Sequence, residues 1–236
     1  MSLTVQYSFM NFIKTLSQKQ IRIIIMTILI VISAILFEEV VDDIFSDPKG
    51  GDPEALIFDK AVLKKFQEIR GPELNQSMID ITALGSFSVI ALFSCVIVTF
   101  LLVHKDWKGL QYIVLIILGS TTLPGILKGF FMRERPDALA RLADVKSTSF
   151  PSGHSFGATV AYFSLAFLLS REIKEIKLEI LYYSLAVIVV ALVGTSRMYL
   201  GVHYPTDIVG GICAGLIWFS IVSIPFVYFS KTTDSV

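Results

Sequence analysis

The chain has 236 residues, a formal net charge of zero at pH 7 and a hydrophobic fraction of 54%. Its mean hydropathy of +0.70 is too high for an ordinary soluble domain, and its balanced charge provides no overall field that would attract nucleic acid. The length suits one domain, and we expect a single membrane domain over residues 1–236.

Six apolar runs are each nearly or fully long enough to cross a bilayer, which takes roughly 17–25 helical residues. They occupy residues 21–37, 81–103, 109–127, 155–170, 180–196 and 208–230. The first run is longer than the apolar core of a signal peptide, and no cleavage motif follows it, so we expect it to remain as a membrane span. The sequence therefore predicts an all-α polytopic membrane protein with six transmembrane helices.

The charges around the first span predict its orientation. Counted over all loops, Lys and Arg are slightly more numerous on the side opposite the N-terminus, but the first helix usually dominates the orientation. Three cations precede or begin this span and four carboxylates follow it: Lys14, Lys19 and Arg22, then Glu38, Glu39, Asp42 and Asp43. We therefore expect a cytoplasmic N-terminus.

Residues 54–70, between the first two spans, have apolar side chains at helical spacing with basic side chains among them. The apolar positions are Ala55, Phe58, Val62, Phe66 and Ile69, and the basic ones are Lys60, Lys64, Lys65 and Arg70. This pattern predicts an amphipathic helix. It either lies on the membrane surface or caps the helix bundle, and the sequence leaves both readings open.

The last apolar run contains a pair of glycines four residues apart, Gly211 and Gly215. Such small residues allow two helix backbones to approach closely within a membrane. We expect the pair to pack within the monomer rather than in a dimer.

Three polar segments interrupt the apolar runs: residues 128–136 (KGFFMRERP), 151–154 (PSGH) and 196–207 (SRMYLGVHYPTD). The first two lie between the third and fourth spans, and the third lies between the fifth and sixth. With six spans, both loops face the same side of the membrane. The side chains of all three segments can therefore meet at one membrane face.

The basic residues of these segments suit a bound phosphate. Lys128 and Arg135 are seven residues apart, which is two helical turns, so they share a face if the helix continues to Pro136. Arg197 follows the fifth run and offers a planar fork of donors to phosphate oxygens. The alternative for Lys128 and Arg135 is a pair of cations that extend to the membrane surface without binding a ligand.

Residues 151–154 immediately precede the fourth span. Backbone N–H groups at a helix N-terminus bind phosphate, and Gly153 would allow the anion to approach closely. Ser152 would add a hydroxyl, and His154 would lie near the phosphate as an acid. The alternative is a turn that only caps the helix.

His203 and Asp207 are four residues apart across Pro205, a spacing that suits the first turn of the sixth span. The carboxylate would accept a hydrogen bond from one imidazole nitrogen and leave the other nitrogen basic and directed at phosphorus. A carboxylate near a helix N-terminus is also favoured as a cap, which is the alternative role for Asp207.

The three segments resemble the three signature motifs of the type 2 phosphatidic acid phosphatase superfamily, which are KxxxxxxRP, PSGH and SRxxxxxHxxxD. Every specified position of the motifs is matched. The resemblance covers roughly residues 80–230. It implies a six-helix membrane bundle with a site at the outer membrane face and His203 as the nucleophile that forms a phosphohistidine. Asp207 would orient His203, while His154 would protonate the leaving oxygen and then activate water. The phosphate would be held without a metal or other cofactor by Lys128, Arg135, Arg197, Ser152 and Gly153.

The resemblance implies that the substrate is a lipid mono- or diphosphate and that the protein lies in a bacterial inner membrane, with its site on the extracytoplasmic side. Undecaprenyl diphosphate, phosphatidylglycerophosphate and phosphatidic acid fit the resemblance. The alternatives are a lipid A phosphatase and a lipid phosphotransferase, which would use the same histidines. A transporter is a more remote alternative, because the ionisable residues cluster at span ends rather than through the bilayer. The sequence does not predict an oligomeric state.

Overall fold

The computed structural model describes residues 16–46, 54–137, 140–171, 173 and 175–229. Every regular element in these ranges is a helix, so the all-α prediction is confirmed. The helices are α2 (Gln18–Phe45), α3 (Glu54–Glu68), α4 (Pro72–Ala83), α5 (Phe87–Val103), α6 (Trp107–Phe131), α7 (Gly153–Ser170), α8 (Ile176–Tyr199) and α9 (Pro205–Tyr228).

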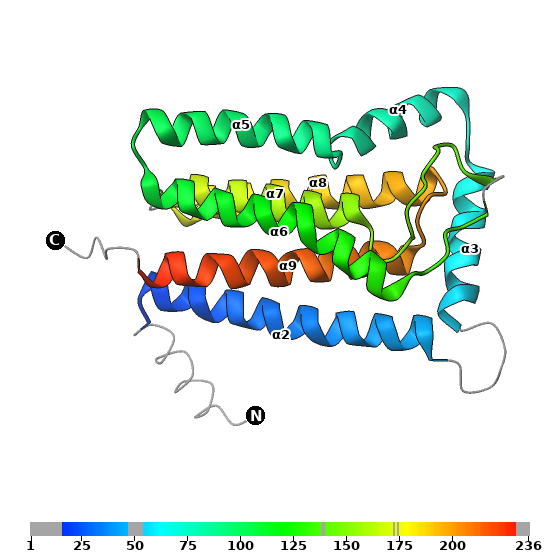
Figure 1. Cartoon of the computed structure of the whole chain (residues 1–236), viewed down its shortest axis with the longest axis horizontal. Coiled ribbons are helices and arrows are strands. Elements are labelled where there is room, and N and C mark those ends of the chain that lie inside the picture. The colour runs from blue at the N-terminus through cyan, green and yellow to red at the C-terminus, as the bar shows by residue number, and fades with distance from the viewer. Residues whose placement is uncertain (1–15, 47–53, 138–139, 172, 174, 230–236) are drawn as a thin grey trace.

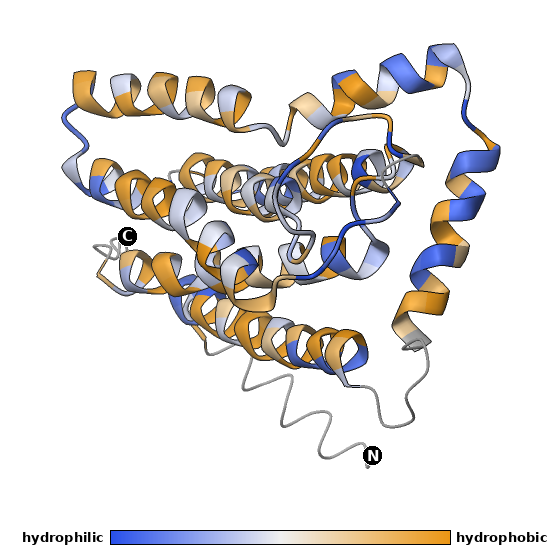
Figure 2. Cartoon of the chain, turned by 45° about the vertical axis from the view of Figure 1, so that its right-hand side comes forward, coloured by the Kyte–Doolittle hydropathy of each residue, from blue (hydrophilic) through white to orange (hydrophobic). Residues whose placement is uncertain are grey.

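The long helices run side by side along the length of the molecule, and α3 crosses one end of them (Figure 1). Helix α7 lies in the interior, where it packs against α5, α6, α8 and α9, and α2 packs along α9. The long helices are mostly hydrophobic, whereas α3 alternates between hydrophobic and hydrophilic residues (Figure 2). The arrangement is that of a membrane helix bundle with a polar end.

Four of the described helices are long and apolar enough to cross a membrane: α2, α6, α8 and α9. A fifth span results if α4 and α5 count together, although they meet at a 41° bend. The apolar run over residues 81–103 is divided between two helices: α4 ends at Ala83, and the Ser86 hydroxyl caps a new helix by accepting from the Val89 N–H.

Helix α7 is less apolar than these four helices, and its position inside the bundle explains why. Its side chains at Ser155, Thr159 and Ser164 are fully buried against other helices. A helix surrounded by protein packs well with small and polar residues and needs little lipid-facing hydrocarbon.

The end of α6 differs from the prediction. The helix stops at Phe131, where Met132 adopts a left-handed conformation with φ of 47° and donates its N–H to the Lys128 carbonyl. This is a common way for a helix to end. Lys128 therefore lies in the last helical turn and Arg135 lies in the following loop. The helix does not continue to Pro136, so the condition under which the two residues would share a helical face is not met.

Gly211 and Gly215 allow α9 to lie directly against α7, as expected for packing within one chain. A Cβ atom at Gly211 would lie 2.6 Å from the Ser152 carbonyl oxygen, and one at Gly215 would lie 2.9 Å from the Thr159 Cβ. The close approach also joins the N-terminal ends of the two helices, because the Ser152 N–H donates to the Asp207 carbonyl at 3.0 Å.

Helix α3 forms over most of the range predicted for an amphipathic helix. Ala55, Asp59 and Leu63, which share one face, are buried against the bundle, whereas Ile57 and Phe58 are more than half exposed. One face of α3 therefore packs on the end of the bundle, and apolar side chains remain on the other side.

Candidate active site

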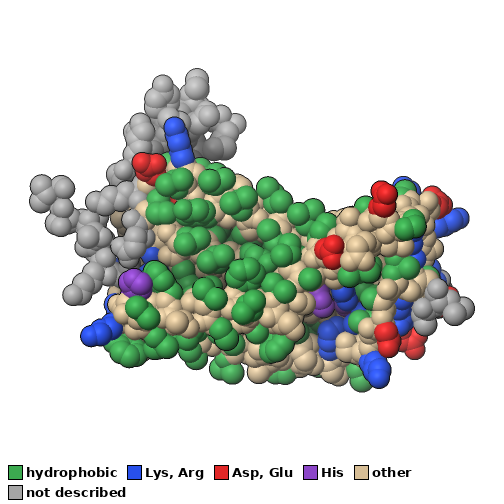
Figure 3. All heavy atoms as spheres, turned by 90° about the horizontal axis from the view of Figure 1, so that it is seen from above, with side chains coloured by type: hydrophobic (Ala, Val, Ile, Leu, Met, Phe, Trp, Pro, Cys, Tyr) green, Lys and Arg blue, Asp and Glu red, His purple; other side chains and the backbone are tan. Residues whose placement is uncertain are grey.

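The residues of the three polar segments gather at the end of the bundle that α3 crosses. Figure 3 shows histidine and basic side chains together there, between a long hydrophobic surface and the charged end of the molecule. Four helices and two loops supply them. Lys128 lies in the last turn of α6, Arg135 lies in the α6–α7 loop, and Ser152, Gly153 and His154 lie at the start of α7. Arg197 lies near the end of α8, His203 lies in the α8–α9 loop, and Asp207 lies in the first turn of α9.

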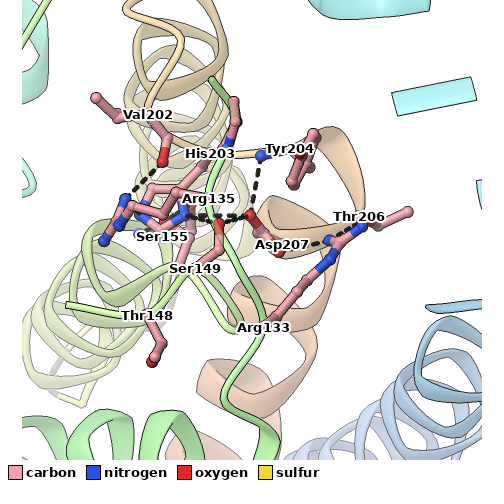
Figure 4. Close-up of polar contacts among 12 residues, drawn as sticks. Arg133, Arg135, Thr148, Ser149, Ser155, Val202, His203, Tyr204, Thr206 and Asp207 are labelled. Atoms are coloured by element: carbon pink, nitrogen blue, oxygen red, sulfur yellow. Dashed lines mark hydrogen bonds and ion pairs between the residues drawn. The ribbon is translucent and has the colours of Figure 1, made fainter. Parts of the chain in front are cut away.

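His203 and Asp207 form the buried centre of the site (Figure 4). The Nδ1 atom of His203 lies 3.3 Å from Oδ2 of Asp207. The same carboxylate oxygen accepts from the Ser149 hydroxyl at 2.5 Å and from the Tyr204 N–H at 2.9 Å. These contacts fix the carboxylate beside Nδ1, which favours the tautomer with its proton on Nδ1 and a lone pair on Nε2.

The environment of His203 keeps its imidazole neutral. The side chain is 2% exposed, and burial lowers the pKa of His203 to about 3, against the opposing effect of Asp207 and with a further lowering by the cations Arg135 and Lys128. A neutral imidazole with a free Nε2 lone pair is the form that acts as a nucleophile or a base.

Arg135 faces the Nε2 atom of His203. Its NH1 group lies 3.2 Å from Nε2 and also donates to the Val202 carbonyl at 2.5 Å, and its Nε donates to the Ser147 carbonyl at 2.6 Å. Burial lowers the pKa of Arg135 from its usual value, although a guanidinium remains charged at neutral pH. A fixed positive charge therefore lies directly beside Nε2 of His203.

Lys128 and Arg197 are also held by neutral groups. The Lys128 ammonium donates to the carbonyls of Thr148 and Ser149 at 2.6 and 3.1 Å. Arg197 is 4% exposed and donates from NH1 to the Thr82 hydroxyl at 3.1 Å, and its buried Nε has no hydrogen-bond partner within the described ranges.

The three motif cations differ in this respect from three other arginines, whereas Arg70 and Arg141 also donate to backbone carbonyls. Lys128, Arg135 and Arg197 form no salt bridge with any carboxylate that the structure describes. By contrast, Arg22 pairs with Glu179, Arg133 with Asp59 and Asp207, and Arg171 with Asp106. Arg197 is buried and Lys128 and Arg135 are half-buried. Cations withdrawn from water without a carboxylate partner are costly, so their positive charge indicates a site for an anionic ligand.

The start of α7 brings its predicted residues to the same place. The Ser152 hydroxyl caps the helix, because it accepts from the N–H and hydroxyl of Ser155 at 3.4 and 3.1 Å. Gly153 lies beside Lys128, since a Cβ atom there would be 3.9 Å from the lysine Cε. His154 lies within the electrostatic range of Lys128, Arg135 and Arg197. The capping role of Ser152 is thus realised, and its contact with phosphate stays a prediction.

Several supporting residues were missed in the sequence. Ser149 precedes the PSGH segment by two positions, and Arg133 occupies an unspecified position inside KxxxxxxRP, so neither stood out. Thr82 and Thr206 are ordinary threonines in the sequence. Asp59 lies within the predicted amphipathic helix and was not singled out, yet it is fully buried and bonded to Arg133. Only the folded arrangement distinguishes these residues.

An apolar groove leads from the site along the bundle. It has a volume of about 490 Å³ and lies between α5, α6 and α7, with Gly153, His154 and Gly157 among its lining residues. The remaining lining residues are mostly apolar or small, including Ile90, Ala91, Cys95 and Val98. The groove therefore connects a hydrocarbon-lined space with the cationic centre.

Comparisons with known proteins identify relatives of this chain. A model of the PAP2 superfamily matches residues 108–230. The chain is 38% identical over 167 residues to phosphatidylglycerophosphatase B of Bacillus subtilis (strain 168), covering 70% of this chain and 81% of that protein. It is 35% identical over 129 residues to lipid A 4'-phosphatase of Porphyromonas gingivalis, covering 50% and 52% of the two chains.

A solved structure has a similar fold. The crystal structure of a transmembrane PAP2-type phosphatidylglycerolphosphate phosphatase from Bacillus subtilis aligns with a TM-score of 0.77 at 31% sequence identity. The alignment covers 86% of this chain and 98% of that chain.

Proposed function

Because the chain belongs to the PAP2 superfamily, we propose that it is a membrane lipid phosphatase that cleaves a lipid mono- or diphosphate through a phosphohistidine at His203. The observation that carries this proposal is the set of three cations without carboxylate partners, Lys128, Arg135 and Arg197, around a buried neutral imidazole. A phosphate group would be the anionic partner that these three cations lack in the structure.

Substrate binding would release the nucleophile. The Nε2 lone pair of His203 faces the Arg135 guanidinium in the structure. Phosphate oxygens are stronger acceptors for a guanidinium than an imidazole nitrogen is, so Arg135 would turn its donors to the phosphate and free Nε2. Lys128, Arg197 and the Gly153 N–H would hold the other oxygens, and their fixed charges would stabilise the transition state.

The reaction would proceed in two displacements. In the first, Nε2 of His203 forms a bond to phosphorus while the bond from phosphorus to the leaving oxygen breaks, and His154 donates a proton to that oxygen. In the second, His154 takes a proton from water, the water oxygen bonds to phosphorus, and the P–N bond breaks to restore His203. Asp207 would hold the Nδ1 proton and stabilise the positive charge on the phosphorylated ring.

The bundle would cross the membrane six times. The four apolar helices and the bent α4–α5 pair supply five crossings, and α7 would make the sixth because it runs through the centre of the same bundle. With the N-terminus in the cytoplasm, six crossings place the site on the extracytoplasmic side of a bacterial inner membrane. The exposed Ile57 and Phe58 of α3 would then lie in the membrane interface.

The apolar groove would hold a hydrocarbon chain of the substrate. It is lined by α5 and α6 and reaches Gly153 and His154, so a lipid lying in the bilayer could place its phosphate among the cations while its chain stays in an apolar environment. Phosphatidylglycerophosphate is the first candidate, because a relative named for it matches most of the chain. Undecaprenyl diphosphate, phosphatidic acid and lipid A are the others.

The test is phosphate release by purified protein in detergent with EDTA present. The substrates are phosphatidylglycerophosphate, undecaprenyl diphosphate, phosphatidic acid, lipid A and glucose 6-phosphate, and His203→Ala protein is the blank. We expect release from at least one lipid and none from the sugar phosphate. Loss of activity in EDTA that Mg²⁺ restores, or release by the blank, would contradict the proposal.

The same measurement separates the hydrolase from a phosphotransferase. A transferase would give little free phosphate until an alcohol such as glycerol is added, and would then yield the phosphorylated alcohol. We expect free phosphate without an added acceptor.

A further inference from the structure

Asp59 is fully buried, although it belongs to the helix at the outer end of the bundle. Its Oδ2 atom accepts from NH2 of Arg133 at 2.7 Å and from the Thr206 hydroxyl at 2.5 Å. Its Oδ1 atom accepts from the Thr206 N–H at 3.1 Å. Both carboxylate oxygens are thus bound to groups that lie beside the active site.

Arg133 connects Asp59 with Asp207. Its NH1 group donates to Oδ1 of Asp207 at 2.6 Å and to the Thr206 hydroxyl at 2.8 Å, as Figure 4 shows for Asp207 and Thr206. The guanidinium also lies over the Tyr204 ring, 4.4 Å from its centroid. Because a guanidinium is planar and rigid, the distance and direction between the two carboxylates are fixed.

The charges in this cluster determine what Asp207 presents to His203. Arg133 carries one positive charge and contacts two carboxylates, so Asp59, Arg133 and Asp207 together have a net charge of −1 when ionised. Without Asp59, the pair of Arg133 and Asp207 would be neutral. Asp59 therefore shares the charge of Arg133 and leaves a net negative charge beside the imidazole.

Asp59 also fixes the beginning of α9. Asp59 accepts a hydrogen bond from the Thr206 N–H, which belongs to the first turn of this helix. A carboxylate is stabilised there by the unpaired backbone donors and the helix dipole. Thr206 and Asp207 are adjacent, so the same contact also fixes the backbone at Asp207 and with it the direction in which the Asp207 side chain points.

We propose that Asp59 and Arg133 are positioning residues of the phosphatase, which hold Asp207 against His203 and preserve the negative charge that this imidazole faces. The inference rests on the proposed role of His203 as nucleophile. It assigns α3, which the sequence indicates as a helix on the membrane surface or at the end of the bundle, to the scaffold of the active site.

The first test compares Asp59→Asn with Glu68→Gln, which removes an exposed carboxylate from the same helix. Turnover of phosphatidylglycerophosphate is measured in detergent with protein that elutes as one species in size exclusion. We expect Asp59→Asn to lower kcat by about 10-fold or more with little change in KM, since supports of a catalytic imidazole typically have effects of this size. Glu68→Gln should match the wild type.

The second test uses the charge balance. Arg133→Met leaves two buried carboxylates without a cation, and we expect it to lower kcat more than Asp59→Asn does. The double variant Asp59→Asn/Arg133→Met restores a net charge of −1, so it should be more active than Arg133→Met alone. Independent structural damage would instead make the double variant the least active of the three.

The third test works even if Arg133→Met does not fold. Thr206→Ser keeps the hydroxyl that joins Asp59 and Arg133, whereas Thr206→Val keeps the shape and loses the hydroxyl. We expect the serine variant to be the more active of the two. Equal kcat values for these variants, or a wild-type kcat for Asp59→Asn, would overturn the inference.

The outcome also distinguishes this inference from the proposed function. If His203→Ala is inactive while Asp59→Asn retains the wild-type kcat, the positioning role is wrong and the phosphatase mechanism stands. If His203→Ala retains activity, the mechanism itself is wrong.

Discussion

Arg133 and Arg135 contact opposite ends of one His203–Asp207 pair. Arg133 donates to Oδ1 of Asp207 at 2.6 Å, and Arg135 lies 3.2 Å from Nε2 of His203. The two arginines are separated by one residue in the loop after α6, yet the first is paired with carboxylates and the second is not. One short segment therefore supplies both a cation paired with carboxylates and the cation that we propose binds the substrate phosphate.

Replacing the two histidines should affect different steps. His203→Ala should lower phosphate release by ~10³-fold or more, because no nucleophile remains. His154→Gln should be slow with lipid substrates but should form the phosphoenzyme from an aryl phosphate, whose leaving group needs no proton. Labelling of the protein with ³²P measures this difference, because a phosphohistidine is stable in base and is hydrolysed in acid. A phosphoenzyme in His203→Ala would contradict the assignment.

Removing the buried cation Arg197 should separate stability from activity. Arg197→Met should reduce kcat/KM by ~10²-fold or more, because a fixed charge on the phosphate is lost. The variant should melt at the same or a higher temperature than the wild type, since an unpaired buried charge has been replaced by an apolar side chain.

Arg22→Met is the matched control for Arg197→Met. It breaks the ion pair with Glu179 at 3.0 Å far from the site, so it should lower the melting temperature and keep activity. The interpretation of Arg197 fails if both variants change stability and activity in the same way.

The neutral state of His203 should make stability depend on pH. Burial lowers the pKa of His203 from 6.5 to about 3, so an unfolded chain takes up a proton at this residue before the folded protein does. The contribution of His203 is present above the unfolded pKa and is lost as the pH falls from about 6.5 towards about 3. His203→Gln should therefore lose less thermal stability than the wild type between pH 7.5 and pH 5.

Thermal melting at these two pH values checks this expectation. His104→Gln serves as the control because His104 is exposed at the other end of the bundle, and it should follow the wild type. An equal loss of stability in the wild type and His203→Gln would contradict a buried neutral imidazole.

Filling the groove should impair only substrates with long chains. Cys95 lines the groove on α5, and Cys95→Trp should raise KM for phosphatidylglycerophosphate by about 10-fold, comparable to the loss of a small buried apolar contact. Turnover of an aryl phosphate should be unchanged. Leu92→Trp, at a position on the same helix that is 65% exposed, is the control, and an equal effect there would place the lipid chain elsewhere.

The sequence predicted much of the bundle and the composition of the site for clear physical reasons. Apolar runs reveal membrane helices, and the motif spacings place Lys128, His154 and His203 at helix ends on one side. The break between α4 and α5 and the end of α6 at Phe131 depend on local capping at Ser86 and Met132, for which the sequence pattern carried little signal. The partners of Asp59 lie 74 and 147 residues further along the chain, and no local pattern encodes them.

The packing of α2 along α9 has a consequence for synthesis of the protein. Among the helices that the structure describes, α2 is the first long one and α9 is the last, so α2 leaves the ribosome well before the helix that packs along it. Asp207 also arrives with this last helix, after the other proposed site residues. The nascent chain therefore lacks the His203–Asp207 pair until α9 has been made, so we expect the proposed active site to be complete only after this last helix packs into the bundle.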